Sequence, residues 1–131
     1  MNHPELVGSF FALLTAFIFL ESRRGGQTVT AQQLTNLVNN EEALVLDVRE
    51  AKEYREGHIT GSTNIVFSKL KDSLSEIESH KEKPVIVVCK MGQHAGAAGK
   101  ILHGAGFKQI KRLSGGIGTW KADGMPLVKG K

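Results

Sequence analysis

The chain of 131 residues contains a single cysteine, Cys89, and this scarcity limits its chemistry. One cysteine excludes an internal disulfide, and it excludes a second thiol in the chain that could resolve an intermediate formed on Cys89. Cysteine and histidine do not occur at the spacing of a zinc site, so we expect no bound metal and no cofactor. Any thiol chemistry of the chain therefore depends on Cys89.

Neither positive nor negative charge is concentrated in one part of the sequence. The 17 Lys and Arg residues and 13 Asp and Glu residues give a net charge of +4 with histidine neutral. The basic residues are spread along the chain and are not interleaved with aromatic residues, which argues against nucleic-acid binding. Hydrophobic residues make up 40% and charged residues 23%, a composition typical of a globular domain with a core.

One long hydrophobic run stands apart from the rest of the chain. Residues 6–20 include no charged residue and would be apolar on every side of a helix. Such a helix would be about 22 Å long, and extension toward Pro4 and Ser22 with local thinning would let it cross a bilayer. Arg23 and Arg24 follow, and positive flanks stay in the cytoplasm. We therefore predict a membrane anchor and linker over 1–26, single-pass in the inner membrane, with the N-terminus outside and residues 27–131 cytoplasmic.

Two alternatives remain for this hydrophobic run. A cleaved signal peptide would need a basic N-terminal region and a small-residue cleavage site, and the sequence has neither. A hydrophobic helix packed on the domain, or buried in an oligomer, would have the same composition.

The rest of the chain alternates predicted strands and helices. A capping box, Thr30–Gln33, is expected to open the first helix, and residues 68–80 are predicted to form an amphipathic helix with Leu70, Leu74 and Ile77 inward. The predicted strands are 28–30 (an edge strand), 43–48, 64–67, 85–88 and 107–113, and the predicted helices are 30–38, 51–56, 68–80, 95–105 and a short one from Ser114. This alternation is typical of an α/β fold with a mainly parallel sheet.

The cysteine ends the most apolar of these strands. Residues 85–88 are all apolar and mostly valine, as expected of a strand buried on both faces. A loop with Gly92 and a helix follow, and such a loop with a helix N-terminus forms an anion-binding site beyond the end of a strand. A thiolate would be stabilised there as a nucleophile. The alternative is an inert cysteine that fills the core.

Four signatures occur in order between Thr28 and Val128. They are Leu46–Glu50 (LDVRE) with Glu53 and Tyr54, Gly57–Ile65 (GHITGSTNI), Ile86–Cys89 (IVVC) with Gly92, and Leu113–Trp120 (LSGGIGTW). Together they resemble the rhodanese (sulfurtransferase) domain family, and with the hydrophobic leader the chain is similar to small membrane-anchored rhodanese proteins of bacteria. The resemblance implies a rhodanese-like five-stranded parallel sheet with helices on both faces.

The resemblance also implies an activity. Cys89 would take a sulfane sulfur as a persulfide from a small donor, thiosulfate or a persulfide, and pass it to a thiol or cyanide; a protein persulfide is an alternative donor. The active-site loop would be Lys90, Met91, Gly92, Gln93 and His94. Asp47, Arg49 and His58 would support the pocket, the first two as a carboxylate–guanidinium pair at a strand end.

The loop departs from the family pattern at its last position. The family usually has Cys-x-x-Gly-x-Arg, and His94 stands here in place of the arginine. Arginine is a permanently charged fork suited to anions, whereas histidine is charged only when protonated. We therefore expect thiosulfate to be a less efficient donor and a persulfide to be at least its equal. The alternative function is a catalytically weak rhodanese-like interaction module at the membrane. Related phosphatases have a loop one residue longer, which disfavours phosphatase chemistry.

Overall fold

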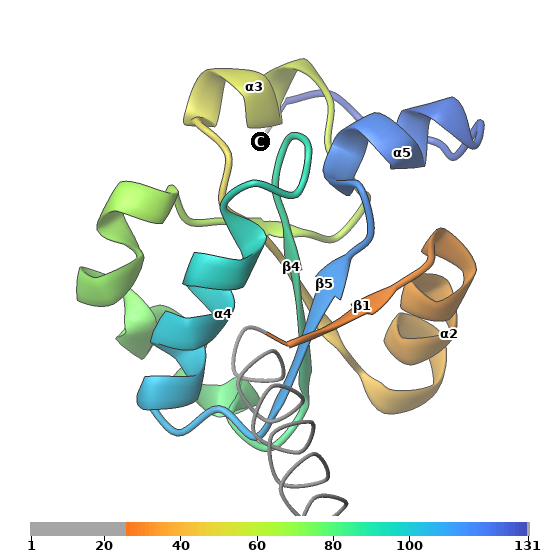
Figure 1. The fold of residues 1–131 in the computed structure, drawn as a ribbon. Coiled ribbons are helices and arrows are strands. Elements are labelled where there is room, and N and C mark those ends of the chain that lie inside the picture. Colours follow the sequence, from red (N-terminus) through yellow and green to blue (C-terminus); the bar gives the residue numbers. More distant parts are fainter. Residues whose placement is uncertain (1–25, 131) are drawn as a thin grey trace, which may run out of the picture.

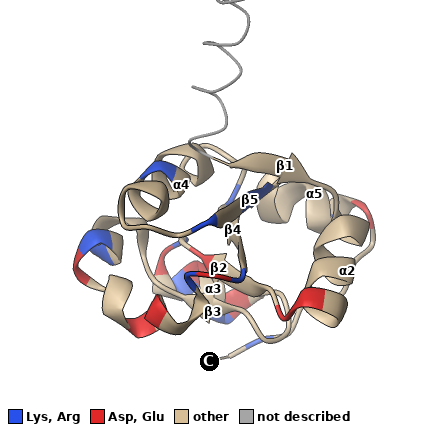
Figure 2. Cartoon of the chain, turned by 90° about the horizontal axis from the view of Figure 1, so that it is seen from below, with Lys and Arg blue, Asp and Glu red and all other residues tan. Residues whose placement is uncertain are grey.

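The computed structural model describes residues 26–130 (Figure 1). The predicted membrane anchor falls almost entirely outside these residues and stays a prediction. Between Gly26 and Gly130 no helix combines the length and the apolar character needed to cross a bilayer. Lys and Arg as well as Asp and Glu are spread over several elements of the described domain, and neither sign gathers on one face in the view of Figure 2.

The predicted five-stranded parallel sheet is confirmed. Its strands are β1 (Gln27–Val29), β2 (Leu44–Asp47), β3 (Thr63–Asn64), β4 (Pro84–Val88) and β5 (Gln109–Leu113). They pair in the order β1-β5-β4-β2-β3, and every pairing is parallel. β4 is central, with Val87 opposite Leu46 of β2 and Arg112 of β5. Pro84 stands first in β4, where its missing N–H interrupts the ladder least.

Helices cover both faces of this sheet, as predicted, because β4 is apolar on both of its faces. Val85 and Val87 pack in one core cluster with α4 (Ala95–Gly104) and with two 3-10 helices, η1 (Phe67–Asp72) and η2 (Leu74–His80). Ile86 and Val88 pack in the other cluster with α2 (Ala31–Glu41) and α5 (Gly116–Ala122). The remaining helix, α3 (Ala51–Glu56), lies beyond the carboxyl ends of the strands (Figure 1).

The start of the first helix was predicted correctly, and its end was not. The Thr30 hydroxyl accepts a hydrogen bond from the Gln33 N–H at 3.1 Å, and the Gln33 side chain accepts one from the Thr30 N–H at 2.9 Å. These bonds form the predicted capping box. The helix continues past Val38 to Glu41, and Glu42 ends it in the left-handed conformation with φ of 55°. Asn39 and Asn40, which follow the predicted end of the helix, are themselves helical, because the chain leaves the helix only at Glu42.

The prediction of one α-helix over 68–80 is wrong. The segment forms η1 and η2, which meet at Ser73 with φ of −115°. Leu70 and Ile77 are nevertheless buried and Leu74 packs partly against them, because three residues per turn place Leu74 and Ile77 on one edge of η2. The predicted strand 64–67 is likewise shorter: β3 covers Thr63–Asn64, and Phe67 already belongs to η1.

The remaining boundaries follow the predictions closely. Helix α3 spans the predicted residues 51–56, and α4 ends one residue early, at Gly104. Gly106 follows α4 with φ of 95°, a conformation that favours glycine and stops a helix. The loops after β2 and β4, the start of α5 and all of α3 gather at the carboxyl edge of the sheet, at the top of Figure 1. This edge is where ligands bind in open α/β sheets.

Candidate active site

Cys89 directly follows the central strand β4. The residue is 2% exposed and belongs to the core cluster that also contains Val87 and Ala95. Two hydrogen bonds fasten the backbone here to α5: the Ile117 N–H donates to the Cys89 carbonyl at 2.9 Å, and the Gly118 N–H donates to the Lys90 carbonyl at 3.0 Å. The sulfur is therefore held at a fixed position where the buried strand turns into the loop.

Two glycines allow this loop and α5 to meet. Gly92 has φ of 90° and open space around it, so its backbone conformation requires glycine. Gly116 has φ of 63°, and a Cβ there would lie 2.2 Å from the Cys89 carbonyl oxygen. Sequence reasoning missed the role of Gly116. The signal was available in the paired glycines Gly115 and Gly116 of the fourth signature.

The side chain of Gln93 folds back over the thiol. Its Oε1 accepts a hydrogen bond from the Met91 N–H at 2.9 Å, and the Cys89 S–H donates to the same oxygen at 3.9 Å. Because the Met91 N–H needs an acceptor, the oxygen end of the amide faces the sulfur. An oxygen acceptor supports the neutral thiol, whereas a thiolate needs donors around it. One of the loop N–H groups expected to bind an anion, that of Met91, is thus hydrogen-bonded to the Gln93 side chain of the same loop.

His94 stands where the family pattern has arginine. It is the residue before α4, and its carbonyl accepts the Ala98 N–H at 2.9 Å. Its ring stacks on Phe67 of η1, with ring centroids 4.9 Å apart and planes 13° apart. The His94 side chain therefore lies against η1 rather than reaching toward α5.

The predicted supporting residues form a buried hydrogen-bonded frame. Asp47 and Arg49 are 1% and 8% exposed, and Arg49 Nη2 lies 2.8 Å from Asp47 Oδ2. Arg49 also donates to the Gly57 carbonyl at 2.7 Å, and Asn64 Nδ2 donates to the carbonyls of Asp47 and Arg49, both at 3.0 Å. The pair thus ties the end of β2 to the end of α3 and to β3, as charge-assisted hydrogen bonds at a strand end do.

His58 fixes the turn after α3. Its ring stacks on Tyr54 with centroids 3.8 Å apart, and its Nδ1–H donates to the Tyr54 carbonyl at 2.8 Å. Its backbone pairs with that of Val128 in an isolated antiparallel bridge. The histidine therefore joins the α3 turn to the C-terminal segment.

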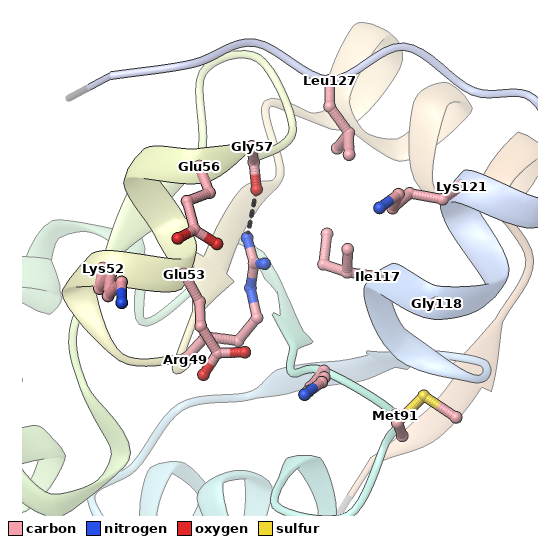
Figure 3. A pocket seen from close by; sticks show the side chains of 11 residues that line it. Arg49, Lys52, Glu53, Glu56, Gly57, Met91, Ile117, Gly118, Lys121 and Leu127 are labelled. Carbon is pink, nitrogen blue, oxygen red and sulfur yellow. Dashed lines mark hydrogen bonds between the residues drawn. The ribbon is translucent and has the colours of Figure 1, made fainter.

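A cavity of about 460 Å³ lies beside the loop, between α3 and α5 (Figure 3). Lys90 and Met91, the two residues after Cys89, line it, and Cys89 itself does not. Sequence reasoning missed the contributions of α3 and α5 to this cavity. Helical spacing was a usable signal, because residues 53 and 56, like residues 117 and 121, are three or four apart and share a helix face. Within 26–130 no cluster of His, Cys, Asp and Glu is placed to hold a metal ion.

The fold and this loop define the class of protein. A family model described as the rhodanese-like domain matches residues 30–123, and the chain belongs to this family. Among curated proteins it is similar to YibN of Escherichia coli K12, described as uncharacterized, with 38% identity over 99% of this chain and 94% of that protein. The thiosulfate sulfurtransferase GlpE of Coxiella burnetii is 35% identical over 66% of this chain and 78% of GlpE.

Solved structures show the same fold. A rhodanese-related protein from Thermoplasma volcanium superimposes with a TM-score of 0.69 and 32% identity, over 78% of this chain and 97% of that one. A thiosulfate sulfurtransferase from Pseudomonas aeruginosa gives a TM-score of 0.70 at 24% identity, over 79% of this chain and 19% of that one. The second likeness concerns the fold alone.

Proposed function

We propose that the protein is a sulfurtransferase that carries a sulfane sulfur as a persulfide on Cys89 and passes it to a thiophilic acceptor. The observation that carries this proposal is the position of the single thiol: it ends the central strand of a rhodanese-like domain, in a loop fastened to α5 by two hydrogen bonds. A partial relative named as a thiosulfate sulfurtransferase supports the same chemistry.

The transfer takes two steps, and neither needs an external oxidant or reductant. The Cys89 thiolate attacks the outer sulfur of thiosulfate; a new S–S bond forms, the donor S–S bond breaks, and sulfite leaves with the electron pair. An acceptor thiolate or cyanide then attacks the outer sulfur of the persulfide, and Cys89 leaves as thiolate. Because Cys89 is the chain's one cysteine, the acceptor comes from outside the chain.

Stabilising the sulfur anion is the task of the loop. The Met91 N–H already points at the space beside Cys89, because its present partner, Gln93 Oε1, lies next to the sulfur. We propose that this oxygen withdraws when the thiolate or persulfide forms, and that the N–H group then serves the sulfur. We propose that backbone N–H groups around Gly92 and at the start of α4 supply the other donors to this anion.

The donor proposed here extends beyond thiosulfate. His94 stacks on Phe67 and offers no permanently charged fork to an anion. The cavity of about 460 Å³ falls within the roughly 300–1,000 Å³ of sites that accept drug-sized ligands. We therefore include the persulfide of a small thiol or of a protein among the donors, with thiosulfate the less efficient one.

The membrane location is also a proposal. The charge-free run of residues 6–20 and the basic pair Arg23 and Arg24 support a single-pass anchor in the inner membrane, with the rhodanese domain in the cytoplasm. Protease protection of spheroplasts tests this orientation: residues 27–131 should survive until the membrane is opened. Digestion of the domain in intact spheroplasts would contradict it.

A second function, a rhodanese-like interaction module, is favoured by one observation. Cys89 is 2% exposed and does not line the cavity, as expected of a cysteine that only fills the core. A stoichiometric partner that copurifies equally with the wild type and with Cys89→Ala would favour this function.

Thiocyanate formation separates the two. With thiosulfate, or with glutathione persulfide, as donor and cyanide as acceptor, the wild type should form thiocyanate faster than the same mixture without protein, and Cys89→Ser should not. A wild type that exceeds the protein-free rate with neither donor, or a variant that accelerates the reaction equally, would contradict the sulfurtransferase proposal.

A further inference from the structure

We infer that a groove between the edge strand β1 and helix α2 binds an extended peptide segment with an acidic side chain, which adds a strand to the five-stranded sheet. This inference goes beyond the proposed function, because the groove shares no described residue with the cavity between α3 and α5. Three features carry it: the open edge of β1, the uncharged hydrogen-bonding groups around that edge, and the charge of the groove.

The main chain of Thr28 is open toward the outside of the sheet. β1 is an edge strand with β5 as its neighbour (Figure 1). The Ser114 N–H donates to the Val29 carbonyl at 2.9 Å, so the main-chain groups of Val29 point toward β5. Successive residues of a strand point these groups to opposite sides, so the N–H and carbonyl of Thr28 point away from β5. No group within residues 26–130 is hydrogen-bonded to them.

The groove lies beside this open edge and has a volume of about 330 Å³. It is lined by residues 27–29 of β1, by Gln33, Asn36 and Leu37 of α2, and by Lys111 of β5. Val29 and Leu37 give it an apolar floor, because both pack in the core cluster under α2. The volume lies at the lower end of the roughly 300–1,000 Å³ of known ligand sites, which suits a short segment of chain.

Amide side chains surround the open edge. The exposed face of a surface helix is commonly charged, but the exposed polar residues of α2 before Glu41 are all amides. They are Gln32, Gln33, Asn36, Asn39 and Asn40.

The capping box holds one of these amides in place at the groove. Gln33 Oε1 accepts the Thr30 N–H at 2.9 Å, which leaves the Gln33 Nε2 group available to a ligand. An amide side chain donates and accepts as a peptide main chain does. Asn36 and Gln33 can therefore add hydrogen bonds to the two that Thr28 offers a bound strand.

The charge of the groove favours an acidic partner. Lys111 is the one charged residue among the described residues that line it, and its Nζ lies 3.4 Å from the neutral Gln27 Oε1. A carboxylate on the bound peptide would give Lys111 an opposite charge. A second copy of the chain, paired through its own β1, would instead bring a second Lys111 to the same edge, where like charges repel.

A proline at position 28 tests the open edge. Thr28→Pro removes the outward N–H, and the ladder with β5 does not use that group, so the variant should stay folded. Thr28→Ala keeps the N–H and is the matched control. Random linear nonapeptides displayed on phage are selected on the full chain in all three forms. We expect the wild type and Thr28→Ala to enrich the same peptides, with Asp or Glu in common, and Thr28→Pro to enrich none of them.

Alternate N-methylation of a selected peptide tests strand pairing without any change in the protein. A strand added at an edge uses every second N–H group. Of two peptides methylated at alternate residues, one should therefore lose binding and the other should keep it. The unmodified peptide should shift the amide NMR signals of Thr28 and Asn36.

Removal of the lysine tests the acidic specificity. Lys111→Gln should raise the dissociation constant of the selected peptide by about fivefold, the effect of one exposed charge contact. Lys108→Gln, which lies just before β5, should leave it unchanged. None of these variants should alter sulfur loading of Cys89, because none belongs to its loop or to the cavity.

Several results would overturn the inference. They are a library that yields no binder, peptides that bind Thr28→Pro as well as the wild type, and equal binding by the two methylated forms. If Thr28→Pro does not fold, the methylated forms decide. Self-association of the full chain that Thr28→Pro abolishes would assign the edge to a second copy and overturn the inference as well. An unchanged dissociation constant in Lys111→Gln would refute the acidic specificity.

Discussion

Replacing Gln93 by glutamate should make the Cys89 thiol harder to ionise. The carboxylate keeps the acceptor for the Met91 N–H, so the loop geometry is preserved, but it adds a negative charge about where Oε1 lies, 3.9 Å from the sulfur. Two unit charges at this separation repel by about 1 kcal/mol at the dielectric constant of water and by about 4 kcal/mol at an effective dielectric constant of about 20. Since Gln93 is exposed, the lower part of this range applies.

The assay is alkylation of Cys89 by iodoacetamide as a function of pH. A repulsion of about 1.4 kcal/mol moves the midpoint of the profile upward by about one pH unit. Gln93→Ala should move the midpoint downward by less than one unit, because it removes the acceptor that favours the neutral thiol and frees the Met91 N–H for the thiolate. Gln32→Glu places the same charge on α2 and should leave the midpoint unchanged. An unchanged or lower midpoint in Gln93→Glu would show that this side chain does not govern the thiol.

Three further substitutions test other parts of the site. Gly116→Ala places a methyl group 2.2 Å from the Cys89 carbonyl oxygen, in a backbone conformation with φ of 63°. It should lower the free energy of unfolding by about 1–3 kcal/mol, measured by urea titration, and abolish sulfur loading of Cys89; full sulfur loading would show that the close contact between Gly116 and Cys89 is not required. Asp47→Ala leaves the buried Arg49 guanidinium without its partner and should cost about 3–5 kcal/mol of stability, measured the same way; a loss below 1 kcal/mol would show that water replaces the carboxylate. His94→Arg restores the permanently charged fork and should raise the second-order rate of loading from thiosulfate about tenfold; an unchanged rate would show that the residue at 94 does not contact the donor.

Much of the sheet could be predicted because the residues of each strand themselves favour a strand. The unbroken apolar run Val85–Val88 demands burial on both faces, which only a central strand of a helix-covered parallel sheet provides. The position of Cys89 at the active edge follows from the same run, since the residue after a parallel strand always lies at the carboxyl edge. The pairing of Asp47 with Arg49 followed from residue type and placement at a strand end.

The helix type of segment 68–80 was less predictable, because packing determines its backbone conformation. Leu70, Leu74 and Ile77 fit an α-helix in sequence, yet Ser73 and Ile77 leave helical geometry where η1 and η2 meet the core. Spacings of three and four residues are compatible with either helix type. Tertiary contacts decided between them, as they commonly override weak local preference.

The cavity and the side-chain conformation of Gln93 could not be predicted from the sequence, for another reason. Glu56 and Lys121 are distant in the chain and face each other only because α3 and α5 both start at the carboxyl edge of the sheet. The Gln93 side chain turns back because the Met91 N–H offers it a donor, and no periodicity records such a choice of rotamer. Local patterns can place a residue on an edge, but they do not show which way its side chain points.

Intact mass combined with peptide mapping tests the sulfur-carrier role of Cys89 most directly. The full chain is incubated with thiosulfate and, separately, with glutathione persulfide, freed of excess donor without reductant, and weighed. One added sulfur atom is expected on the wild type with at least one donor, mapped to the peptide that contains Cys89, with none on Cys89→Ala. A wild type that gains no sulfur from either donor, or a Cys89→Ala variant that gains as much, would contradict the role assigned to this thiol.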